Sequence, residues 1–152
     1  MDGSTTMTVY ADTTAVVERV ADGWRADLLE EVWAAAGRVV AAATLYPEVR
    51  SCVRVRQVDG VLDEAGAAAA IERLDELVAD VELVAVDATL AGRAAELAER
   101  HGLDSDAALH LAAALAVDAP RVVVATFDPG LAQAAVEAGL AVIPQARVAV
   151  AA

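Results

Sequence analysis

Short apolar runs alternate along the chain with longer segments in which apolar and polar residues recur at helical spacing. This alternation predicts strands separated by helices, and therefore an α/β fold with a parallel sheet. The short runs are apolar at every position, as in strands that are buried on both faces of a sheet. The strands are expected at residues 9–11, 39–41, 83–86, 122–125 and 141–143.

The segments between these runs predict the helices that cover the sheet. Helices are expected from residue 13 or 14, over 24–36, 45–58 and 63–79, from 87 to about 101, from 104–106 to before 120, and over 129–138. Gly37 and Gly139 follow two of these segments, and glycine commonly ends a helix. We therefore expect three layers, with a central parallel sheet of four to five strands flanked by helices.

Acidic residues follow two of the predicted strands. Asp12 comes directly after the first strand, and Asp128 comes shortly after the fourth. Function in open parallel sheets gathers beyond the carboxyl ends of the strands, so both carboxylates lie where a site is expected. Both are also good helix N-caps. Asp128 precedes Pro129, a typical first helical residue, whereas Thr13 or Thr14 could replace Asp12 as a cap.

Glu48 interrupts an apolar stripe on the helix predicted at 45–58. Leu45, Val49 and Cys52 form this stripe, and helical spacing places Glu48 on or beside it. A carboxylate that faces the core costs free energy unless it is paired or bound to a metal. The alternative is an edge position from which Glu48 reaches water, and the pattern leaves both open.

Asp104 and Asp106 begin the helix that carries His110. This helix is apolar nearly all round, which predicts that it is buried and that its start faces the interior or a cleft. Asp106 and His110 are four residues apart and share a face. Acidic residues are also favourable in a first helical turn without any further role. His110 is interpreted as a hydrogen-bonded core residue.

The composition suits one domain over residues 1–152, with residues 1–6 as an N-terminal extension and 145–152 as a C-terminal tail. Hydrophobic residues make up 58% of the chain and aromatic residues only 3%, so the core must consist of Ala, Val and Leu. The single Cys52 cannot form an internal disulfide, and it is interpreted as a small buried side chain. The polar start and the lack of a long apolar run predict a cytoplasmic protein with no membrane contact.

The net charge of −13 argues against binding nucleic acid by charge alone, because phosphate contacts need cations. Two explanations fit this charge: metal ions meet a phosphate, or the chain binds a basic partner. The chain contains arginine but no lysine, which excludes a catalytic lysine.

Four segments together resemble the PIN-domain ribonucleases, specifically the VapC-type toxins of bacterial toxin–antitoxin pairs. VYADTTAVV at 9–17 resembles the opening strand with its acidic residue, and YPEVR at 46–50 resembles the segment with the helix-borne Glu. HGL at 101–103 leading to ALHLAAAL at 108–115, and TFD at 126–128 followed by Leu131 and Ala132, resemble the later segments. The likeness spans about residues 7–143.

This resemblance implies a metal-dependent endoribonuclease toxin that cleaves RNA phosphodiesters. Asp12 and Asp128 would bind Mg²⁺ or Mn²⁺ most directly, and Glu48 and Asp106 would bind it through water or orient that water. Thr13 or Thr126 could hydrogen-bond a ligand or a phosphate. The implied partners are the RNA substrate, a cognate antitoxin whose C-terminal segment blocks the metal site, and a second copy of the chain in a homodimer.

The chain departs from the family at its third acidic position, three residues before the histidine, where it has Ala107. Asp106 lies one residue earlier, about 100° around the helix, and Asp104 is a second candidate. A third interpretation is that one ligand is lost. The alternative function is then a catalytically weakened PIN-type domain that binds RNA or protein.

Two other features leave alternatives open. Arg50, Arg54 and Arg56 form a basic cluster that contacts RNA or a partner subunit, or is simply a solvated helix face. Phosphoacceptor domains and aspartate-nucleophile phosphatases also place an Asp after a first strand. They typically need a basic residue near the phosphoryl group, often a lysine, which is missing here.

Overall fold

The structure is a computed structural model that describes residues 6–144. It confirms the α/β class predicted from the sequence. In chain order the elements are β1 (Thr8–Ala11), α1 (Thr13–Val20), α2 (Ala26–Ala35), β2 (Arg38–Ala42), α3 (Leu45–Val58), α4 (Glu64–Ala79), β3 (Glu82–Val84), α5 (Ala88–His101), α6 (Ser105–Leu115), β4 (Val122–Ala125), α7 (Pro129–Glu137) and β5 (Ala141–Ile143).

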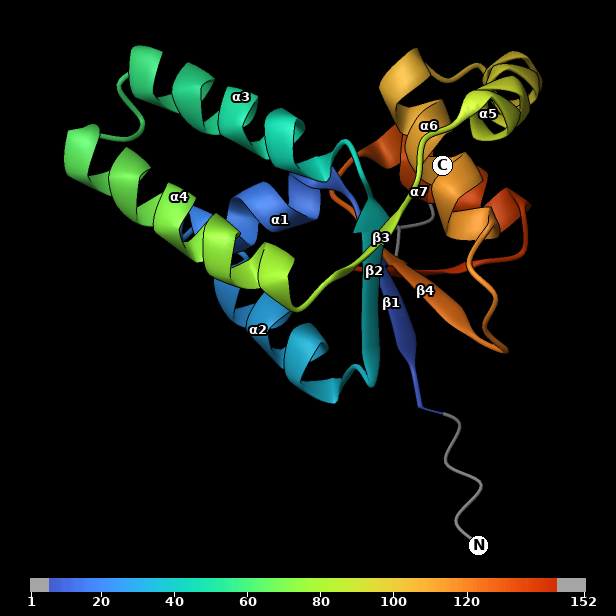
Figure 1. Ribbon diagram of the computed structural model, residues 1–152, viewed down its shortest axis with the longest axis horizontal. Helices are drawn as coiled ribbons and strands as arrows, with labels where there is room; N and C mark the ends of the chain where they lie inside the picture. The colour runs from blue at the N-terminus through green and yellow to red at the C-terminus, as the bar shows by residue number, and fades with distance from the viewer. Residues whose placement is uncertain (1–5, 145–152) are drawn as a thin grey trace, which may run out of the picture.

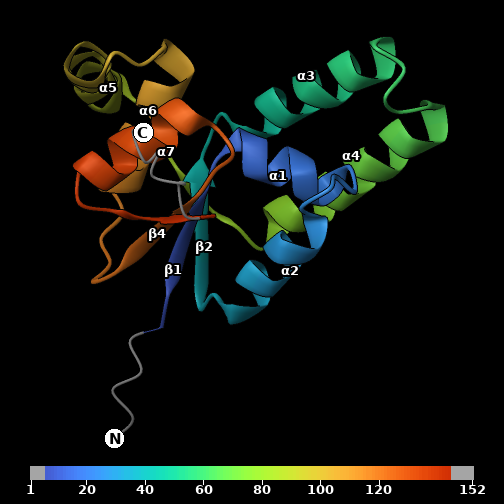
Figure 2. The ribbon, with the colours of Figure 1, turned by 180° about the vertical axis from the view of Figure 1, so that it is seen from behind.

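The strands form one five-stranded sheet in the order β3-β2-β1-β4-β5, and every neighbouring pair is parallel. Helices α1 to α4 lie on one face of the sheet and α5 to α7 on the other (Figure 1), and the view from behind shows the same three layers (Figure 2). From β1 the chain adds β2 and β3 on one side of the sheet and then β4 and β5 on the other, so the topological switch point lies between β1 and β4. Open parallel sheets commonly bind ligands at such a switch point, beyond the carboxyl ends of the strands.

Alternating residues of β1 enter the cores on the two faces of the sheet. Tyr10 packs in the cluster formed with α5, α6 and α7, whereas Val9 and Ala11 pack among α1 to α4. All three are fully buried. Because helices cover both faces of the sheet, side chains at every position of such a strand are buried and apolar. This explains the continuous apolar runs in the sequence.

Two predicted boundaries are wrong. The third strand was expected at 83–86, but β3 ends at Val84, because Val84 pairs with Ala42 and β2 ends there. The second helix was expected from Trp24, but α2 begins at Ala26. A turn takes up the intervening residues: Asp22 has a φ of 49°, and the Gly23 amide donates to the Glu18 carbonyl at 2.8 Å.

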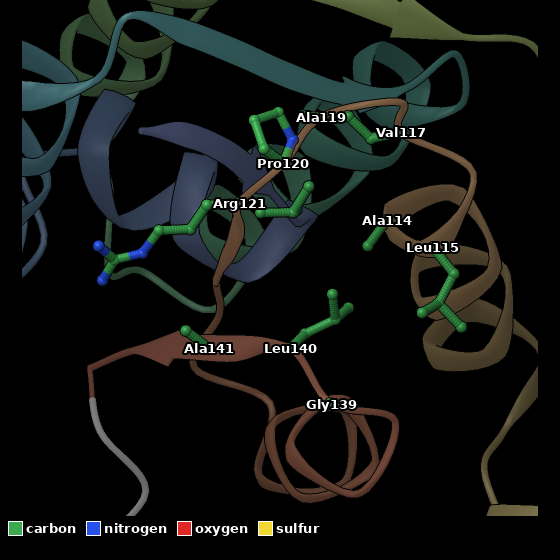
Figure 3. Close-up of a pocket in the computed structure, with 10 residues that line it drawn as sticks. Ala114, Leu115, Val117, Ala119, Pro120, Arg121, Gly139, Leu140 and Ala141 are labelled. Carbon is green, nitrogen blue, oxygen red and sulfur yellow. The ribbon is translucent and has the colours of Figure 1, made fainter. Parts of the chain in front are cut away.

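A cavity of about 360 Å³ lies at the amino ends of β4 and β5. The end of α6, the α6–β4 connection and the start of β5 line it, and Arg121 is the only charged residue among the lining residues within 6–144 (Figure 3). It contains none of the predicted site residues.

None of the helices within residues 6–144 has the length and apolar character needed to cross a bilayer. Apart from residue 6, the predicted extension and tail lie outside the described residues.

Candidate metal and nuclease site

The topology brings the predicted site residues to the carboxyl edge of three adjacent strands. Asp12 directly follows β1, Asp128 follows β4, and Glu48 lies in the first turn of α3, the helix after β2. Because β2, β1 and β4 are neighbours in a parallel sheet, their carboxyl ends share one edge. Asp106 lies in the first turn of α6.

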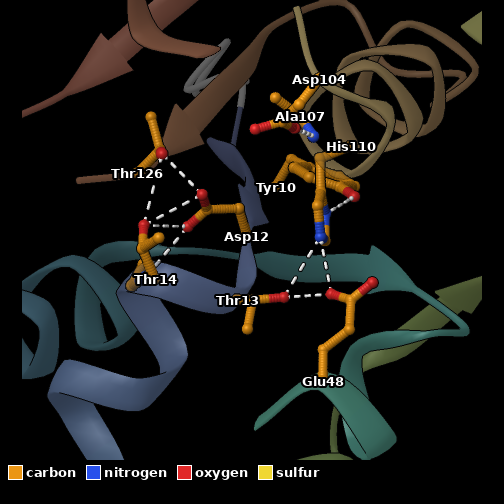
Figure 4. A network of polar contacts seen from close by, with 10 residues as sticks. Tyr10, Asp12, Thr13, Thr14, Glu48, Asp104, Ala107, His110 and Thr126 are labelled. Carbon is orange, nitrogen blue, oxygen red and sulfur yellow. Dashed lines mark hydrogen bonds and ion pairs between the residues drawn. The ribbon is translucent and has the colours of Figure 1, made fainter. Parts of the chain in front are cut away.

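Asp12 is held in place by hydroxyl and amide donors. Its Oδ1 accepts hydrogen bonds from the Ala15 amide at 2.9 Å and from the Thr14 hydroxyl at 2.8 Å. Its Oδ2 accepts from the Thr126 hydroxyl at 2.6 Å, and the Thr14 hydroxyl also lies within hydrogen-bond distance of this oxygen, at 3.0 Å (Figure 4). Asp12 is therefore the N-cap of α1, and Thr13 and Thr14 do not take over that role.

Asp12 is also a buried acid, with only 2% of its surface exposed. Burial raises its pKa above the ordinary value, against the opposing effect of the hydrogen bonds from Thr126, Ala15 and Thr14 and the charge of His110. No arginine forms an ion pair with Asp12 within residues 6–144. A buried carboxylate with hydroxyl partners and no guanidinium is a natural position for a bound cation.

A second network connects Glu48 with three other side chains. The His110 Nε2 lies 2.8 Å from the Glu48 Oε2, and the Thr13 hydroxyl donates to the same oxygen. On the other side of the ring, the Tyr10 hydroxyl lies 2.8 Å from the His110 Nδ1. The prediction that His110 is a hydrogen-bonded core residue is confirmed, since it is 4% exposed.

These contacts shift the pKa values of Glu48 and His110 in opposite directions. Burial alone would raise the pKa of Glu48, but hydrogen bonds from His110 and Thr13 hold it below the ordinary value. Burial alone would lower the pKa of His110, but the hydrogen bond to Glu48 and the charges of Glu48, Asp12 and Asp106 raise it. Both shifts favour the ion pair between these two side chains, and the contact at 2.8 Å lets His110 orient Glu48.

Asp128 caps α7, as its position before Pro129 predicts. Its Oδ1 accepts from the amides of Gly130 and Leu131 at 2.9 and 3.1 Å. Its own amide donates to the Thr126 hydroxyl at 3.0 Å, and Thr126 donates in turn to Asp12. Asp128 and Asp12 are thus joined through Thr126, while the Asp128 Oδ2 takes no hydrogen bond from residues 6–144.

The start of α6 separates the two candidates for the third acidic position. Asp104 is the N-cap, and its Oδ1 accepts from the Ala107 amide at 2.9 Å. Asp106 is exposed and forms no hydrogen bond or ion pair within residues 6–144, but its charge acts on the buried His110. Ala107 is buried in the core. Asp106 therefore has both carboxylate oxygens without a hydrogen bond from residues 6–144, whereas Asp104 uses one oxygen as the cap.

The donors at this edge are carboxylate and hydroxyl oxygens, which match the preference of Mg²⁺ for oxygen ligands. In the described part of the chain, however, no three His, Cys, Asp or Glu side chains gather closely enough to hold a metal ion. The structure brings Asp12 and Glu48 into adjoining networks through Thr13 and Thr14. It leaves the carboxylates of Asp106 and Asp128 outside those networks.

The three arginines of the predicted basic cluster lie on α3 and have different contacts. Arg56 forms an ion pair with the buried Glu18 at 2.5 Å. Arg50 donates to the Tyr46 hydroxyl and Arg54 to the Gln57 side chain, and both are exposed. Cys52 was predicted to be a small buried side chain, but it is only half-buried.

Sequence reasoning missed two members of the site. Thr14 was expected only as a capping alternative, but it donates to Asp12 and accepts from the Phe127 amide at 2.8 Å. Tyr10 was interpreted as part of a buried strand, but its hydroxyl contacts His110. A tyrosine in an otherwise aliphatic strand was the available signal, because a buried phenol usually has a hydrogen-bond partner.

A family model described as PIN domain matches residues 9–137. Ribonuclease VapC45 of Mycobacterium tuberculosis strain CDC 1551 / Oshkosh is 32% identical over 136 residues, which is 90% of this chain and 94% of that protein. The chain belongs to the VapC-type PIN-domain family. Ribonuclease VapC49 of strain H37Rv matches this VapC-type chain with the same identity and coverage.

Solved structures share the fold of this VapC-type chain. FitAcB from Neisseria gonorrhoeae aligns with a TM-score of 0.64 at 20% identity, covering 88% of this chain and 95% of that one. VapBC2 from Rickettsia felis, bound to a promoter DNA fragment, aligns at 0.59 and 17%, covering 90% and 97%. The sarcin–ricin-loop-cleaving toxin VapC20 of M. tuberculosis aligns at 0.58 and 18%, covering 75% and 86%.

Proposed function

We propose that this chain is a Mg²⁺- or Mn²⁺-dependent endoribonuclease that cleaves RNA phosphodiesters at the carboxyl edge of β1 and β4. The observation that carries the proposal is the buried carboxylate of Asp12, which accepts four hydrogen bonds from three donor groups and has no guanidinium partner within residues 6–144. Membership of the VapC-type family supplies the substrate class, since the two relatives are named ribonucleases.

Asp12 and Asp128 would hold the cation most directly, and Glu48 and Asp106 would act through water. When bound, the cation supplies Lewis-acid stabilisation of charge at the phosphodiester. The protein side chains contribute orientation: Thr14 and Thr126 fix both oxygens of Asp12, and the hydrogen bonds of Thr13 and His110 fix one oxygen of Glu48. Asp128 can cap α7 through Oδ1 and still offer Oδ2.

The partners follow from the same proposal. A cognate antitoxin would neutralise the nuclease by placing its C-terminal segment over the carboxylates, and two copies of the chain would form a homodimer. Among the solved neighbours, VapC20 is described as a toxin, and VapBC2 is bound to a DNA fragment from its promoter. Co-purification of a partner protein with the tagged chain from its host, followed by recovery of nuclease activity after the partner is removed, tests the proposed antitoxin.

The first prediction compares two aspartates that cap helices after strands. Asp128→Asn keeps the cap of α7, because Asn caps as well as Asp, but it removes a proposed metal ligand. We expect cleavage of RNA in Mg²⁺ to fall about 100-fold or more, since the Lewis-acid contribution amounts to several kcal/mol. Induced expression of each variant, with growth measured and new RNA ends mapped, is the readout.

The matched control is Asp87→Asn, because Asp87 caps α5 after β3 in the same way and is exposed. It should arrest growth and produce the same RNA ends as the wild type. RNA ends that appear in both variants, or in neither variant nor the wild type, would contradict metal-dependent cleavage at this site.

A second function is favoured by one observation, the lack of a three-residue acidic or histidine cluster within the described residues. In this alternative the chain is a catalytically weakened PIN-type domain that binds RNA or protein. Calorimetric titration with Mn²⁺ separates the two. The nuclease proposal requires binding that Asp12→Ala abolishes, whereas no binding to either protein favours the weakened domain.

A further inference from the structure

A small aromatic and cationic cluster lies next to the carboxylate site, and its side chains take no part in the networks described above. The rings of Trp24 and Phe127 have their centroids 6.3 Å apart at an interplanar angle of 43°. The Arg25 guanidinium carbon lies 4.7 Å from the Trp24 ring centre and 5.7 Å from that of Phe127. Trp24 is 80% exposed, so most of its indole surface is open to a ligand.

Phe127 connects this cluster to the proposed catalytic edge. It stands between Thr126 and Asp128 in the chain, and its amide donates to the Thr14 hydroxyl at 2.8 Å. Thr14 in turn donates to Asp12. The aromatic cluster is therefore one residue along the backbone from Asp128 and two hydrogen bonds from Asp12.

The turn that carries Trp24 is held by its surroundings. The Gly23 amide donates to the Glu18 carbonyl, and a Cβ at Gly23 would lie only 1.7 Å from the Glu18 carboxylate. Glu18 is buried and is paired with Arg56 on α3. An exposed ring on a fixed turn loses little conformational entropy when a ligand stacks on it.

Charge points to the class of ligand. Arg25 forms no ion pair with a carboxylate of residues 6–144, although the chain carries 24 acidic residues. Arginine beside exposed aromatic rings is the combination that proteins use to bind single-stranded nucleic acid, with rings stacking on bases and the guanidinium near phosphate.

The surroundings of Trp24 do not favour a protein partner. In the described part of the chain, the other exposed large apolar side chains lie on α3, the α3–α4 turn, β3, α6 and α7. A single exposed ring is far smaller than the contiguous apolar patches that mark protein interfaces. A stacked base, by contrast, needs only one ring face.

We propose that Trp24, Arg25 and Phe127 form a stacking subsite for one unpaired base of a single-stranded RNA whose backbone reaches the carboxylate edge. The inference rests on the proposed function for the identity of its ligand. The subsite gives the chain a way to hold RNA despite its net charge of −13.

The experiment measures binding without cleavage. Fluorescence anisotropy follows a labelled single-stranded oligoribonucleotide in low-salt buffer with EDTA, using the full chain. Trp24→Ala should weaken binding about 5- to 150-fold, the range for loss of one base–aromatic stack. Trp24→Phe should retain most of the affinity. Val58→Ala is the control, because Val58 is an exposed apolar side chain that is not part of the subsite, and this variant should bind as the wild type does.

Abasic RNA separates stacking from a general loss of structure. An abasic nucleotide is placed at each position of the RNA in turn. At one position it should weaken binding by the wild type, whereas Trp24→Ala should bind that abasic RNA as tightly as it binds intact RNA. Arg25→Gln should lower the slope of log affinity against log salt by about 0.7, as loss of one phosphate contact predicts. Thermal unfolding checks that the variants fold.

Three results would overturn the subsite. They are no RNA binding by the wild type, equal binding of intact RNA by wild type and Trp24→Ala, or an equal loss of affinity for abasic RNA in both proteins. Unchanged RNA binding with reduced self-association of Trp24→Ala in sedimentation would instead assign the cluster to a protein contact. Adding Mg²⁺ then distinguishes the two proposals. RNA binding that depends on Trp24 but is not followed by cleavage would support the subsite and contradict the nuclease proposal. Cleavage by Trp24→Ala with the wild-type KM would support the nuclease proposal and contradict the subsite.

Discussion

At the scale of single residues, Asp12 carries a conflict between stability and function. Its carboxylate is 2% exposed, and burial raises its pKa, so the ionised form is disfavoured in the folded chain without a cation. A residue chosen for stability alone would be a neutral N-cap. A charged group in this position is what a cation site requires, and it is the kind of local inconsistency that marks functional positions.

Asp12→Asn tests this conflict. Because the folded pKa of Asp12 is raised, its contribution to stability is fully present below the unfolded pKa and is lost as pH rises through the folded pKa. Asn carries no charge at any pH and can still accept from the Ala15 amide. In EDTA we therefore expect the variant to unfold at higher denaturant than the wild type near neutral pH. In Mg²⁺, the variant should cleave RNA at least about 100-fold more slowly than the wild type.

Chemical denaturation at several pH values is the measurement, and the free-energy difference between variant and wild type should grow with pH across that window. Asp87→Asn, at an exposed cap, supplies the comparison for a substitution without burial. A variant less stable than the wild type at every pH would show that the Asp12 carboxylate stabilises the fold by itself.

At the scale of elements, the strands and helices were predictable because each has a strong local pattern. The fully apolar runs at 9–11 and 122–125 fall within β1 and β4, and Pro129 and Gly139 bracket α7. The misplaced ends depend on tertiary contacts. The length of β3 is set by where its neighbour β2 ends, and the start of α2 is set by a turn bonded back to Glu18.

The candidate site was predictable only in part, for a related reason. Acids at strand ends identify an edge, so Asp12 and Asp128 could be placed there from the sequence alone. The direction of each carboxylate depends on partners far along the chain, such as Thr126 for Asp12 and His110 for Glu48. No local pattern shows that Tyr10 bonds His110 across 100 residues, or that Arg56 pairs with Glu18.

Helix α6 offers a prediction at this scale, because its two first acids have different partners. Asp104 caps the helix, so Asp104→Ala should lower the free energy of unfolding by about 1 kcal/mol and leave Mn²⁺ affinity unchanged. Asp106 makes no hydrogen bond to residues 6–144 and is the proposed water-mediated ligand. Asp106→Asn should leave stability unchanged and weaken Mn²⁺ binding about 10- to 100-fold, as loss of an outer partner of a metal does.

Thermal unfolding and Mn²⁺ calorimetry on the two variants measure both effects. The opposite assignment, with metal affinity lost in Asp104→Ala alone, would make Asp104 the substitute for the acid missing at Ala107. Metal affinity unchanged in both variants would mean that α6 contributes no ligand, and that Asp12, Glu48 and Asp128 are the whole acidic set.

At the scale of the molecule, the net charge of −13 means that any cation stabilises the fold to some degree by reducing repulsion among carboxylates. A specific site adds a term that depends on the ion. If Mg²⁺ binds the folded chain alone, a concentration 100 times Kd contributes about 2.7 kcal/mol, which corresponds to a rise in Tm of about 5–10 °C for a chain of this size.

The comparison that isolates this term is MgCl₂ against NaCl at equal ionic strength, read by thermal unfolding of the wild type and of Asp12→Asn. General screening raises the Tm of both proteins equally in both salts. A specific site raises the Tm of the wild type more in MgCl₂, and Asp12→Asn should lose that excess because its buried anion is gone. Equal excess in both proteins would move the cation away from Asp12, to acids elsewhere on the surface.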